Sequence, residues 1–186
     1  ILANMAVDDE IELEIGATGG IALLVTTLRE GSAEELTSTL SALDILTTAE
    51  SNQVHFLESG GNALLVPILA SATTSKQEEY AAAIARNVCS VDEARRFLGS
   101  TGALTSLVQI ASRGSEDACS SALAALWRAL VLDDNITAMG TARTIRVLVQ
   151  ILKSGTAIHK ELASGVIRSL AFSDTNEDLI VELGGI

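Results

Sequence analysis

One short pattern, a pair of small residues followed by an apolar run, returns at a fixed interval along the whole chain. It reads GGIALLV at 19–25, GGNALLV at 60–66 and GALTSLV at 102–108. A degenerate copy, RTIRVLV, occupies 143–149, and a fifth copy begins at 184–186. Equivalent positions 20, 61, 103, 144 and 185 are separated by 41, 42, 41 and 41 residues. A constant period of this length predicts a solenoid built from stacked structural repeats.

A second marker keeps the same interval. It reads LANMA at 2–6, LDILT at 43–47, ARNVC at 85–89, WRALV at 127–131 and IRSLA at 167–171. A polar break rich in Asp, Asn, Thr and Ser follows each copy, as at 51–52, 133–135 and 174–176. Such residues favour helix N-caps, so we expect each polar break to cap the helix that follows it.

Each repeat is predicted to contain three helices. A short first helix, such as 52–59, ends at the paired glycines, which permit a sharp turn. An apolar second helix, such as 61–71, leads through a polar turn into a longer third helix. In the third helix Leu36, Leu40 and Leu43 fall on one stripe. No stretch alternates with period two for long enough to form a strand, so the chain is predicted to be all-α.

On these residues the chain resembles the armadillo-repeat family. The period, the Gly-Gly-Ile/Leu-x-x-Leu-Val opening of the second helix and the Leu-x-Asn-Leu-like end of the third helix all fit, over essentially the whole chain. The resemblance implies a right-handed α-solenoid of about four three-helix repeats of 41–42 residues. HEAT repeats share the period range but have two helices and lack the paired-glycine turn, so they are the second choice.

We expect residues 1–186 to form a single armadillo-repeat domain that is incomplete at both ends. The chain begins inside a third helix and ends on the first turn of a second helix near position 185. Neither end has the polar capping repeat that a solenoid needs for solubility. The expectation is an interior part of a longer solenoid, which would fray or aggregate when excised.

Charge and cysteine content narrow the classes of partner. The net charge is −12, which disfavours nucleic acid and anionic membrane surfaces, and no apolar run is long enough for membrane insertion. Cys89 and Cys119 show no metal-type spacing and are predicted to be free, buried thiols in a reducing compartment. The predicted location is therefore cytoplasmic, with nuclear or organellar locations open.

No catalytic or metal-binding constellation is recognisable, and no cofactor is predicted. His55 and His159 lie on different repeats without a nucleophile or ligand at motif spacing. The glycine-rich stretch 16–20 lacks the preceding strand of a phosphate-binding loop. Trp127 shares its stripe with leucines and is expected in the core, whereas Tyr80 is expected to show its hydroxyl to a groove. The chain is therefore predicted not to be an enzyme.

The family resemblance implies a partner-binding groove lined by the third helices. The family's asparagine ladder, which holds a partner's backbone, would fall at five positions: Asn4, Ile45, Asn87, Ala129 and Ser169. Only Asn4 and Asn87 match. Where nuclear-import adaptors carry tryptophan, this chain has Ser41, Ala83, Ala125 and Gly165. The missing tryptophans disfavour an import adaptor.

Arginines recur beside the ladder. The residue before each ladder position is Ala3, Asp44, Arg86, Arg128 and Arg168 in turn. Arginine favours bidentate contact with carboxylates, so the hypothesis is a row that meets an acidic segment of a partner. The alternative is pairing within the chain, for example with Glu79 or Glu161.

The convex face offers a second hypothesis, in which acidic first-helix residues meet a basic partner or are simply solvated. These residues are Glu10, Glu12, Glu14, Glu58, Glu177, Asp178 and Glu182. The predicted function is a protein-binding scaffold that holds an extended or helical partner within a larger assembly. The alternatives are the armadillo portion of a ubiquitin ligase or other regulatory enzyme, and, less favoured, a nuclear-transport adaptor.

Overall fold

The computed structural model describes residues 9–184, which form the helices α2 to α14 and contain no strand. Three helix types alternate along the chain. The short first helices are α2 (Asp9–Ala17), α5 (Glu50–Glu58), α8 (Asp92–Ser100), α11 (Asp133–Met139) and α14 (Asp174–Glu182). The second helices are α3 (Gly20–Glu30), α6 (Gly61–Ser71), α9 (Ala103–Arg113) and α12 (Ala142–Ser154). The third helices are α4 (Ala33–Leu46), α7 (Ser75–Val88), α10 (Glu116–Ala129) and α13 (Ala157–Leu170).

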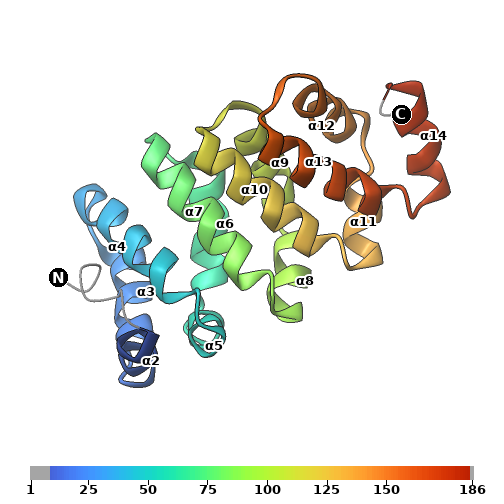
Figure 1. Cartoon of the computed structure of the whole chain (residues 1–186). Coiled ribbons are helices and arrows are strands. Elements are labelled where there is room, and N and C mark those ends of the chain that lie inside the picture. Colours follow the sequence, from blue (N-terminus) through green and yellow to red (C-terminus); the bar gives the residue numbers. More distant parts are fainter. Residues whose placement is uncertain (1–8, 185–186) are drawn as a thin grey trace.

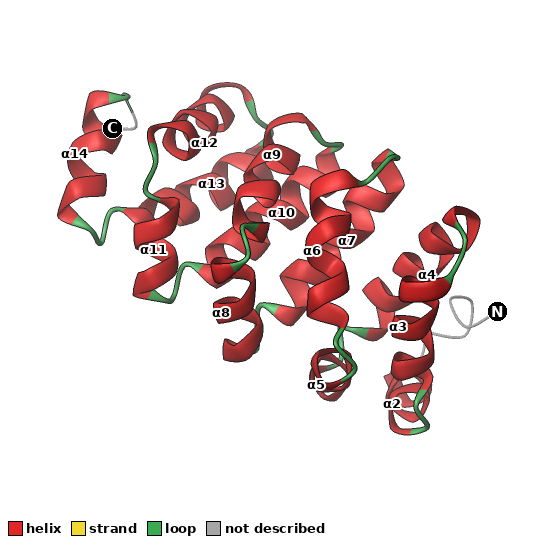
Figure 2. Ribbon diagram, turned by 180° about the vertical axis from the view of Figure 1, so that it is seen from behind, coloured by secondary structure: helices red, strands yellow, loops and turns green. Residues whose placement is uncertain are grey.

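The repeats stack into an elongated solenoid. Figure 1 shows the third helices α4, α7, α10 and α13 side by side across the near face. Figure 2, from behind, shows the second helices as a separate layer, with α6 and α9 in front of α7 and α10. One apolar cluster runs from Ile21 in α3 to Ile180 in α14. Stacking buries the apolar faces that a single repeat would leave exposed, as the sequence predicted.

Left-handed glycines make the turn from first to second helix. Gly19, Gly60 and Gly102 have φ of 86°, 79° and 79°, and a second helix begins at the next residue. The predicted starts at 20, 61 and 103 are thus confirmed. The fourth copy lacks this glycine, and α12 begins at Ala142, two residues before the expected position 144, after a Thr141 cap. The expected start at 185 lies outside the described residues.

All four described third helices begin with a side-chain N-cap, as the second helix α12 does with Thr141. The hydroxyls of Ser32, Thr74, Ser115 and Thr156 each accept a hydrogen bond from the backbone N–H three residues later. First helices do begin at or beside the polar breaks 51–52, 133–135 and 174–176, but the predicted side-chain caps there are wrong. Asn52, Asn135 and Asn176 are each the third residue of their helix and are buried, and the residues before those helices make no side-chain cap.

These asparagines instead join consecutive repeats. The Nδ2 group of Asn135 donates to the carbonyl of Ala129, 2.9 Å away at the end of α10, and to that of Arg95, 3.1 Å away in the preceding first helix α8. Asn52 and Asn176 make the equivalent pair of bonds. The Oδ1 atoms of the three asparagines lie against Gly16, Gly99 and Gly140, where an added Cβ would be 1.7–1.8 Å away. We call each such contact an Asn–Gly interlock.

One interface lacks the interlock. The eighth residue of α5, equivalent to Gly16 and Gly99, is Leu57, and the third residue of α8, equivalent to Asn52 and Asn135, is Ala94. Both members of the pair have changed together. A large apolar side chain takes the glycine position and a small one takes the asparagine position, so an Asn–Gly interlock cannot form between α5 and α8.

The two cysteines are buried within the stack. Cys89 is 0% exposed, and burial raises the pKa of its thiol to about 12. Cys119 is 6% exposed, burial raises the pKa of its thiol to about 11, and its Sγ donates to the Ala111 carbonyl. Both are free thiols.

The native protein is therefore expected to resist thiol reagents. At pH 8 neither thiol is ionised appreciably, and Cys89 is fully enclosed, so alkylation, above all of Cys89, should be far slower than in a model peptide. Mass spectrometry after a timed exposure to N-ethylmaleimide measures this, with the urea-unfolded chain as the control that should react at both positions. Rapid labelling of Cys89 in the native state would contradict the burial described here.

Within residues 9–184, no single helix is long and apolar enough to cross a bilayer; only α2 and α3 together reach that length, as a pair bent by 69°.

Candidate partner-binding face

We define the third-helix face as the exposed side of α4, α7, α10 and α13. Each of these helices has 14 residues. Their last residues, Leu46, Val88, Ala129 and Leu170, are therefore equivalent. The penultimate row is Ile45, Asn87, Arg128 and Ser169, and the row before it is Asp44, Arg86, Trp127 and Arg168.

This register corrects the predicted arginine row. Arg86 and Arg168 share one structural position, but Trp127 takes that position in α10, and Arg128 lies one residue further along. Arg128, and not Ala129, thus occupies the asparagine-ladder position, and the tryptophan position of import adaptors falls on Ala124 instead of Ala125. The face combines two arginine positions with an aromatic residue.

Hydrogen bonds between repeats confirm the register. The Asn87 Nδ2 donates to the Asp44 carbonyl at 3.0 Å and to the Thr47 hydroxyl at 3.1 Å. The Arg128 Nη1 donates to the Arg86 carbonyl at 2.9 Å, which is the corresponding carbonyl one repeat later. Arg128 therefore replaces the asparagine as a link to the preceding repeat while its guanidinium remains exposed.

Arg86 is held within the chain. Its Nη2 lies 3.7 Å from the Asp44 carboxylate, its Nε donates to the Asn87 Oδ1, and its Nη1 donates to the Ser121 hydroxyl. Burial raises the pKa of Asp44, and the Arg86 charge opposes that rise. Within the chain, Arg86 therefore pairs with Asp44, which takes the equivalent position in α4, and not with Glu79 or Glu161.

Arg168 covers the ring of Trp127. Its guanidinium carbon lies 5.7 Å from the ring centroid, a cation–π distance. Gly165 provides the space beneath the ring, since an added Cβ would be 2.8 Å from it. A hollow of about 280 Å³ opens here between α10 and α13, also lined by Glu161 and Ser164. Trp127 is half-buried: it packs against the core as expected but also lines the face.

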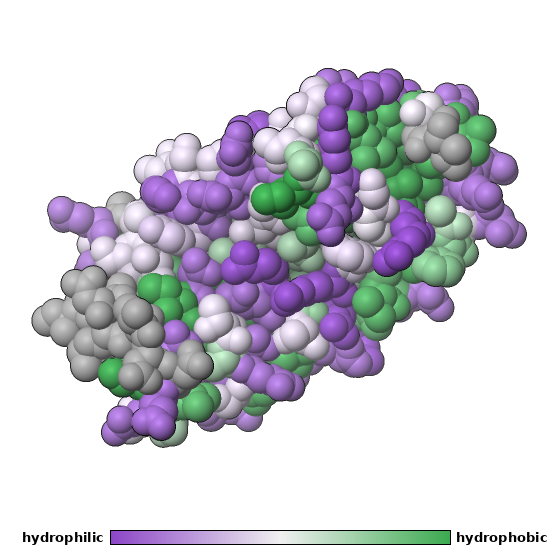
Figure 3. All heavy atoms as spheres, viewed as in Figure 1, coloured by the Kyte–Doolittle hydropathy of each residue, from purple (hydrophilic) through white to green (hydrophobic). Residues whose placement is uncertain are grey.

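Two arginines on this face have no acidic partner. Among residues 9–184, no carboxylate lies within 4.0 Å of the guanidinium of Arg128 or Arg168. Exposed apolar residues follow each arginine: Val131 is 66% exposed and Phe172 is 80% exposed. Figure 3 shows this side of the molecule as largely hydrophilic, with apolar groups gathered near its C-terminal end.

The other predicted site residues lie apart from this arginine pair. Tyr80 is half-buried in α7, with the Lys76 ammonium 5.8 Å from its ring centroid. Ile45 is half-buried against the core in α4. Asn87 is only 6% exposed, and its amide is already bonded to α4 and the turn after it. Asn4 lies outside the described residues.

The described part of the chain holds no group of three or more His, Cys, Asp or Glu side chains placed to bind a metal. The histidines have local partners. The His55 Nδ1 is 3.6 Å from the Glu58 carboxylate, and the His159 Nε2 is 3.0 Å from the Glu116 carbonyl.

Comparisons with known proteins agree with this architecture. No family model matches the chain. It is 27% identical to U-box domain-containing protein 7 of Arabidopsis thaliana over an alignment of 186 positions, which covers 96% of this chain and 23% of that protein. The chain therefore spans less than a quarter of that relative's length.

Solved structures share the fold over almost the whole chain. A computationally designed armadillo repeat protein for modular peptide recognition superposes with a TM-score of 0.89 at 22% identity, over 100% of this chain and 79% of its own. The armadillo repeats only protein of Plasmodium falciparum gives a TM-score of 0.77 at 17% identity, over 91% and 77%. With three helices per repeat, a left-handed glycine turn and these neighbours, the chain has the fold of an armadillo-repeat solenoid.

Proposed function

We propose that the chain is a protein-interaction scaffold that binds an extended segment of a partner across the third-helix face. The observation that carries this proposal is the row geometry: α4, α7, α10 and α13 lie side by side and present equivalent positions at each repeat. Packed helices lie about 10 Å apart, which corresponds to about three residues of an extended peptide. The designed neighbour made for modular peptide recognition shares this architecture, which supports the proposal.

The partner segment is proposed to be acidic and to lie over α10 and α13. Asp44 and Arg86 pair with each other near the N-terminal end of the face. Within residues 9–184, Arg128 and Arg168 have no carboxylate within 4.0 Å, although the chain has a net charge of −12. Arginine beside an exposed aromatic surface is a common interface anchor, because it combines bidentate hydrogen bonding with stacking. Carboxylates of the partner would supply the missing charges.

Reversing both charges tests this proposal. Partner binding by Arg128→Glu/Arg168→Glu is expected to weaken roughly 10- to 100-fold, since two favourable contacts become repulsive. The unfolding midpoint should change little because both side chains are exposed. Fluorescence anisotropy with a labelled acidic peptide measures the affinity, and circular dichroism checks the fold. Arg96→Glu, an exposed change on α8, is the matched control and should bind as the wild type does.

An unchanged affinity in the folded double variant would exclude the proposed arginine contacts. Micromolar binding of a basic import-signal peptide on the same face would instead favour the transport-adaptor alternative. We propose that residues 1–186 do not themselves catalyse a reaction and that the protein acts as a subunit of a larger assembly. The two buried thiols suit a reducing, cytoplasmic location, which imaging of the tagged full-length protein tests.

A ubiquitin-ligase context is the second candidate. The observation that favours it is the 27% identity to a U-box protein along 96% of this chain. In that case the third-helix face would hold a substrate or regulator while a separate domain acts. The full-length protein should then support ubiquitin transfer with purified activating and conjugating enzymes, and residues 1–186 alone should not. Absence of transfer by the full-length protein would remove this candidate.

A further inference from the structure

The second helix α12 carries a basic stripe that differs from the rest of this acidic chain. Arg143, Arg146, Gln150 and Lys153 are spaced at i, i+3, i+7 and i+10, so they share one face of the helix, and all four are exposed. The helix contains no acidic residue. In the described part of the chain, no carboxylate lies within 4.0 Å of any of its three cationic groups.

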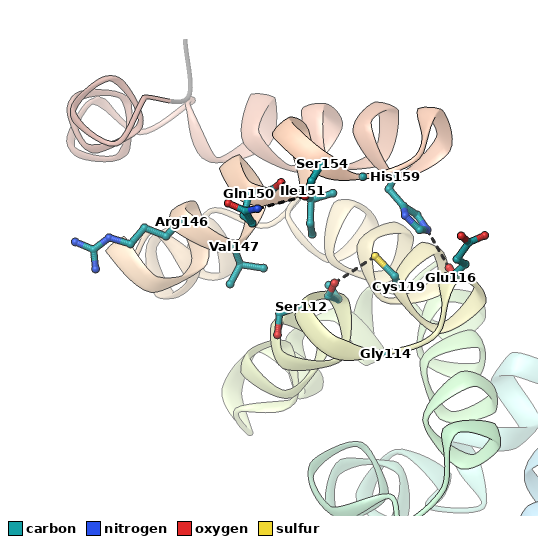
Figure 4. A pocket seen from close by; sticks show the side chains of 12 residues that line it. Ser112, Gly114, Glu116, Cys119, Arg146, Val147, Gln150, Ile151, Ser154 and His159 are labelled. Atoms are coloured by element: carbon teal, nitrogen blue, oxygen red, sulfur yellow. Dashed lines mark hydrogen bonds between the residues drawn. The ribbon is translucent and has the colours of Figure 1, made fainter.

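An apolar pocket adjoins this stripe. It has a volume of about 400 Å³ and lies between α9 and α12, beside the N-terminal ends of α10 and α13. Figure 4 shows Val147, Ile151 and Cys119 around the hollow, while the Arg146 side chain extends away from it. Gln150 and Ser154 also line it from α12. Ser112, Glu116 and His159 also line it, so the pocket combines an apolar patch with polar groups, one of them acidic, and cationic groups lie along α12.

The neighbouring interface explains why the pocket is open. Between α7 and α9, the Arg113 guanidinium lies 3.0 Å from the Glu78 carboxylate. Arg113 ends α9 and Glu78 is the fourth residue of α7. The equivalent residues one repeat later are Ser154, which ends α12, and Cys119, the fourth residue of α10. Two small side chains therefore replace a long ion pair, and the space they leave is the pocket.

We propose that this pocket and the α12 stripe, together the α12 site, bind an acidic segment of a protein partner that inserts one bulky aliphatic side chain. The pocket has the volume of a typical ligand cleft, and Val147 and Ile151 in its lining favour the burial of an apolar side chain. The cations on α12, which have no carboxylate within 4.0 Å in the described chain, favour a partner segment with negative charges around its inserted aliphatic side chain. The α12 site belongs to the second-helix layer and is separate from the third-helix face, so it does not depend on the function proposed above.

Three labelled peptides test the two requirements separately. The first is a short Asp- and Glu-rich peptide with a central leucine, the second has serine in place of the leucine, and the third has Asn and Gln in place of the acids. Fluorescence anisotropy should show binding of the first peptide to the whole chain. Loss of the leucine should weaken binding roughly 10- to 100-fold, because one buried aliphatic side chain is removed. The neutral peptide should bind roughly tenfold more weakly than the acidic leucine peptide, and this difference in affinity should shrink in high salt because salt screens the charges.

Variants place the binding on the chain. Cys119→Glu/Ser154→Arg recreates the ion pair of the neighbouring interface, so it should fold normally, fill the pocket and abolish binding. Arg146→Glu/Lys153→Glu leaves the pocket intact and should weaken binding of the acidic peptide. Arg96→Glu, an exposed change on α8, is the control and should leave it unchanged, whereas Arg128→Glu/Arg168→Glu reports any peptide that is held at the third-helix face instead.

Three results would overturn the proposal: no binding of the acidic leucine peptide at millimolar concentration, equal binding of the serine peptide, or undiminished binding by the folded, pocket-filled variant. Binding that is lost only in Arg128→Glu/Arg168→Glu would assign the peptide to the third-helix face. That outcome would exclude the α12 site and support the function proposed for the other face.

Discussion

Replacing Gly99 with alanine is expected to destabilise the solenoid by about 2–4 kcal/mol, a large effect for the addition of one methyl group. The new Cβ would lie 1.8 Å from the Asn135 Oδ1, so the asparagine must move. Its Nδ2 would then lose the bonds to the carbonyls of Ala129 and Arg95, at 2.9 Å and 3.1 Å. Asn135 is only 3% exposed, so solvent cannot replace both bonds. The cost combines steric displacement with buried polar groups left unpaired.

The chain itself supplies the compensating change. Gly99→Leu/Asn135→Ala copies the natural Leu57 and Ala94 pair and should recover most of the stability lost in Gly99→Ala. Urea unfolding followed by circular dichroism measures both variants. Ser100→Ala, at the exposed next position of α8, is the control and should change stability by less than about 0.5 kcal/mol. If Gly99→Ala unfolds at the wild-type urea concentration, the interlock does not stabilise the stack.

Gly61→Ala is expected to cost about 2–3 kcal/mol for a different reason, the overpacking of a closed core. An added Cβ would lie 2.4 Å from the ring of Phe56, which is 0% exposed. The ring is rigid and fully enclosed, so it can move only by displacing its neighbours. The φ of Gly61 is not positive, so backbone strain does not contribute.

A partner substitution again separates the causes. In the next repeat the equivalent positions are Leu98 and Ala103, where a flexible side chain accommodates the methyl group. Phe56→Leu/Gly61→Ala should therefore be more stable than Gly61→Ala alone. Thermal unfolding of the two variants and of Phe56→Leu completes the cycle. A double variant that is no more stable than Gly61→Ala would show that Phe56 is not what resists the methyl group.

The features that could be read from the sequence are those with a strict backbone requirement. A turn with φ near 80° demands glycine, so Gly19, Gly60 and Gly102 mark the period directly. The apolar stripe of each third helix is equally plain because burial repeats every three or four residues. Fold class, helix order and three of the second-helix starts followed from these two signals.

The register of α10 could not be read in this way. One interval in each series is 42 residues long. Between glycine turns it is the interval from Gly60 to Gly102, and between third-helix ends it is the earlier interval from Leu46 to Val88. Both intervals include the turn between α6 and α7, which is one residue longer than the turn between α3 and α4. Matching Arg128 to Arg86 by residue type assumes an interval of 42 residues, but the third helices α7 and α10 end 41 residues apart, at Val88 and Ala129. The sequence-based alignment was therefore wrong by one residue in α10. Hydrogen bonds from Asn87 and Arg128 to the preceding repeat resolve the shift.

The Asn–Gly interlocks were hidden for another reason. An asparagine near a helix start is most often a cap, and that local preference concealed a contact to a glycine 36 residues earlier in the chain. The pairing depends on how two repeats stack, and nothing within one repeat requires it. The spacing of the arginines in the sequence was enough to find those of the third-helix face. That Trp127 takes the same position as Arg86 and Arg168 could be seen only once the helix bounds were known.

The interface without an interlock has a mechanical consequence. Amide hydrogen bonds are directional, so the joints at Asn52, Asn135 and Asn176 resist a small rotation of one first helix over the next. Leu57 and Ala94, which take these positions at the α5–α8 interface, can form no such bond. The α5–α8 interface is therefore expected to bend more easily than the α2–α5, α8–α11 and α11–α14 interfaces. A solenoid that adjusts its pitch to fit a long partner would flex there, while the segment from α8 to α14 turns as a stiffer unit.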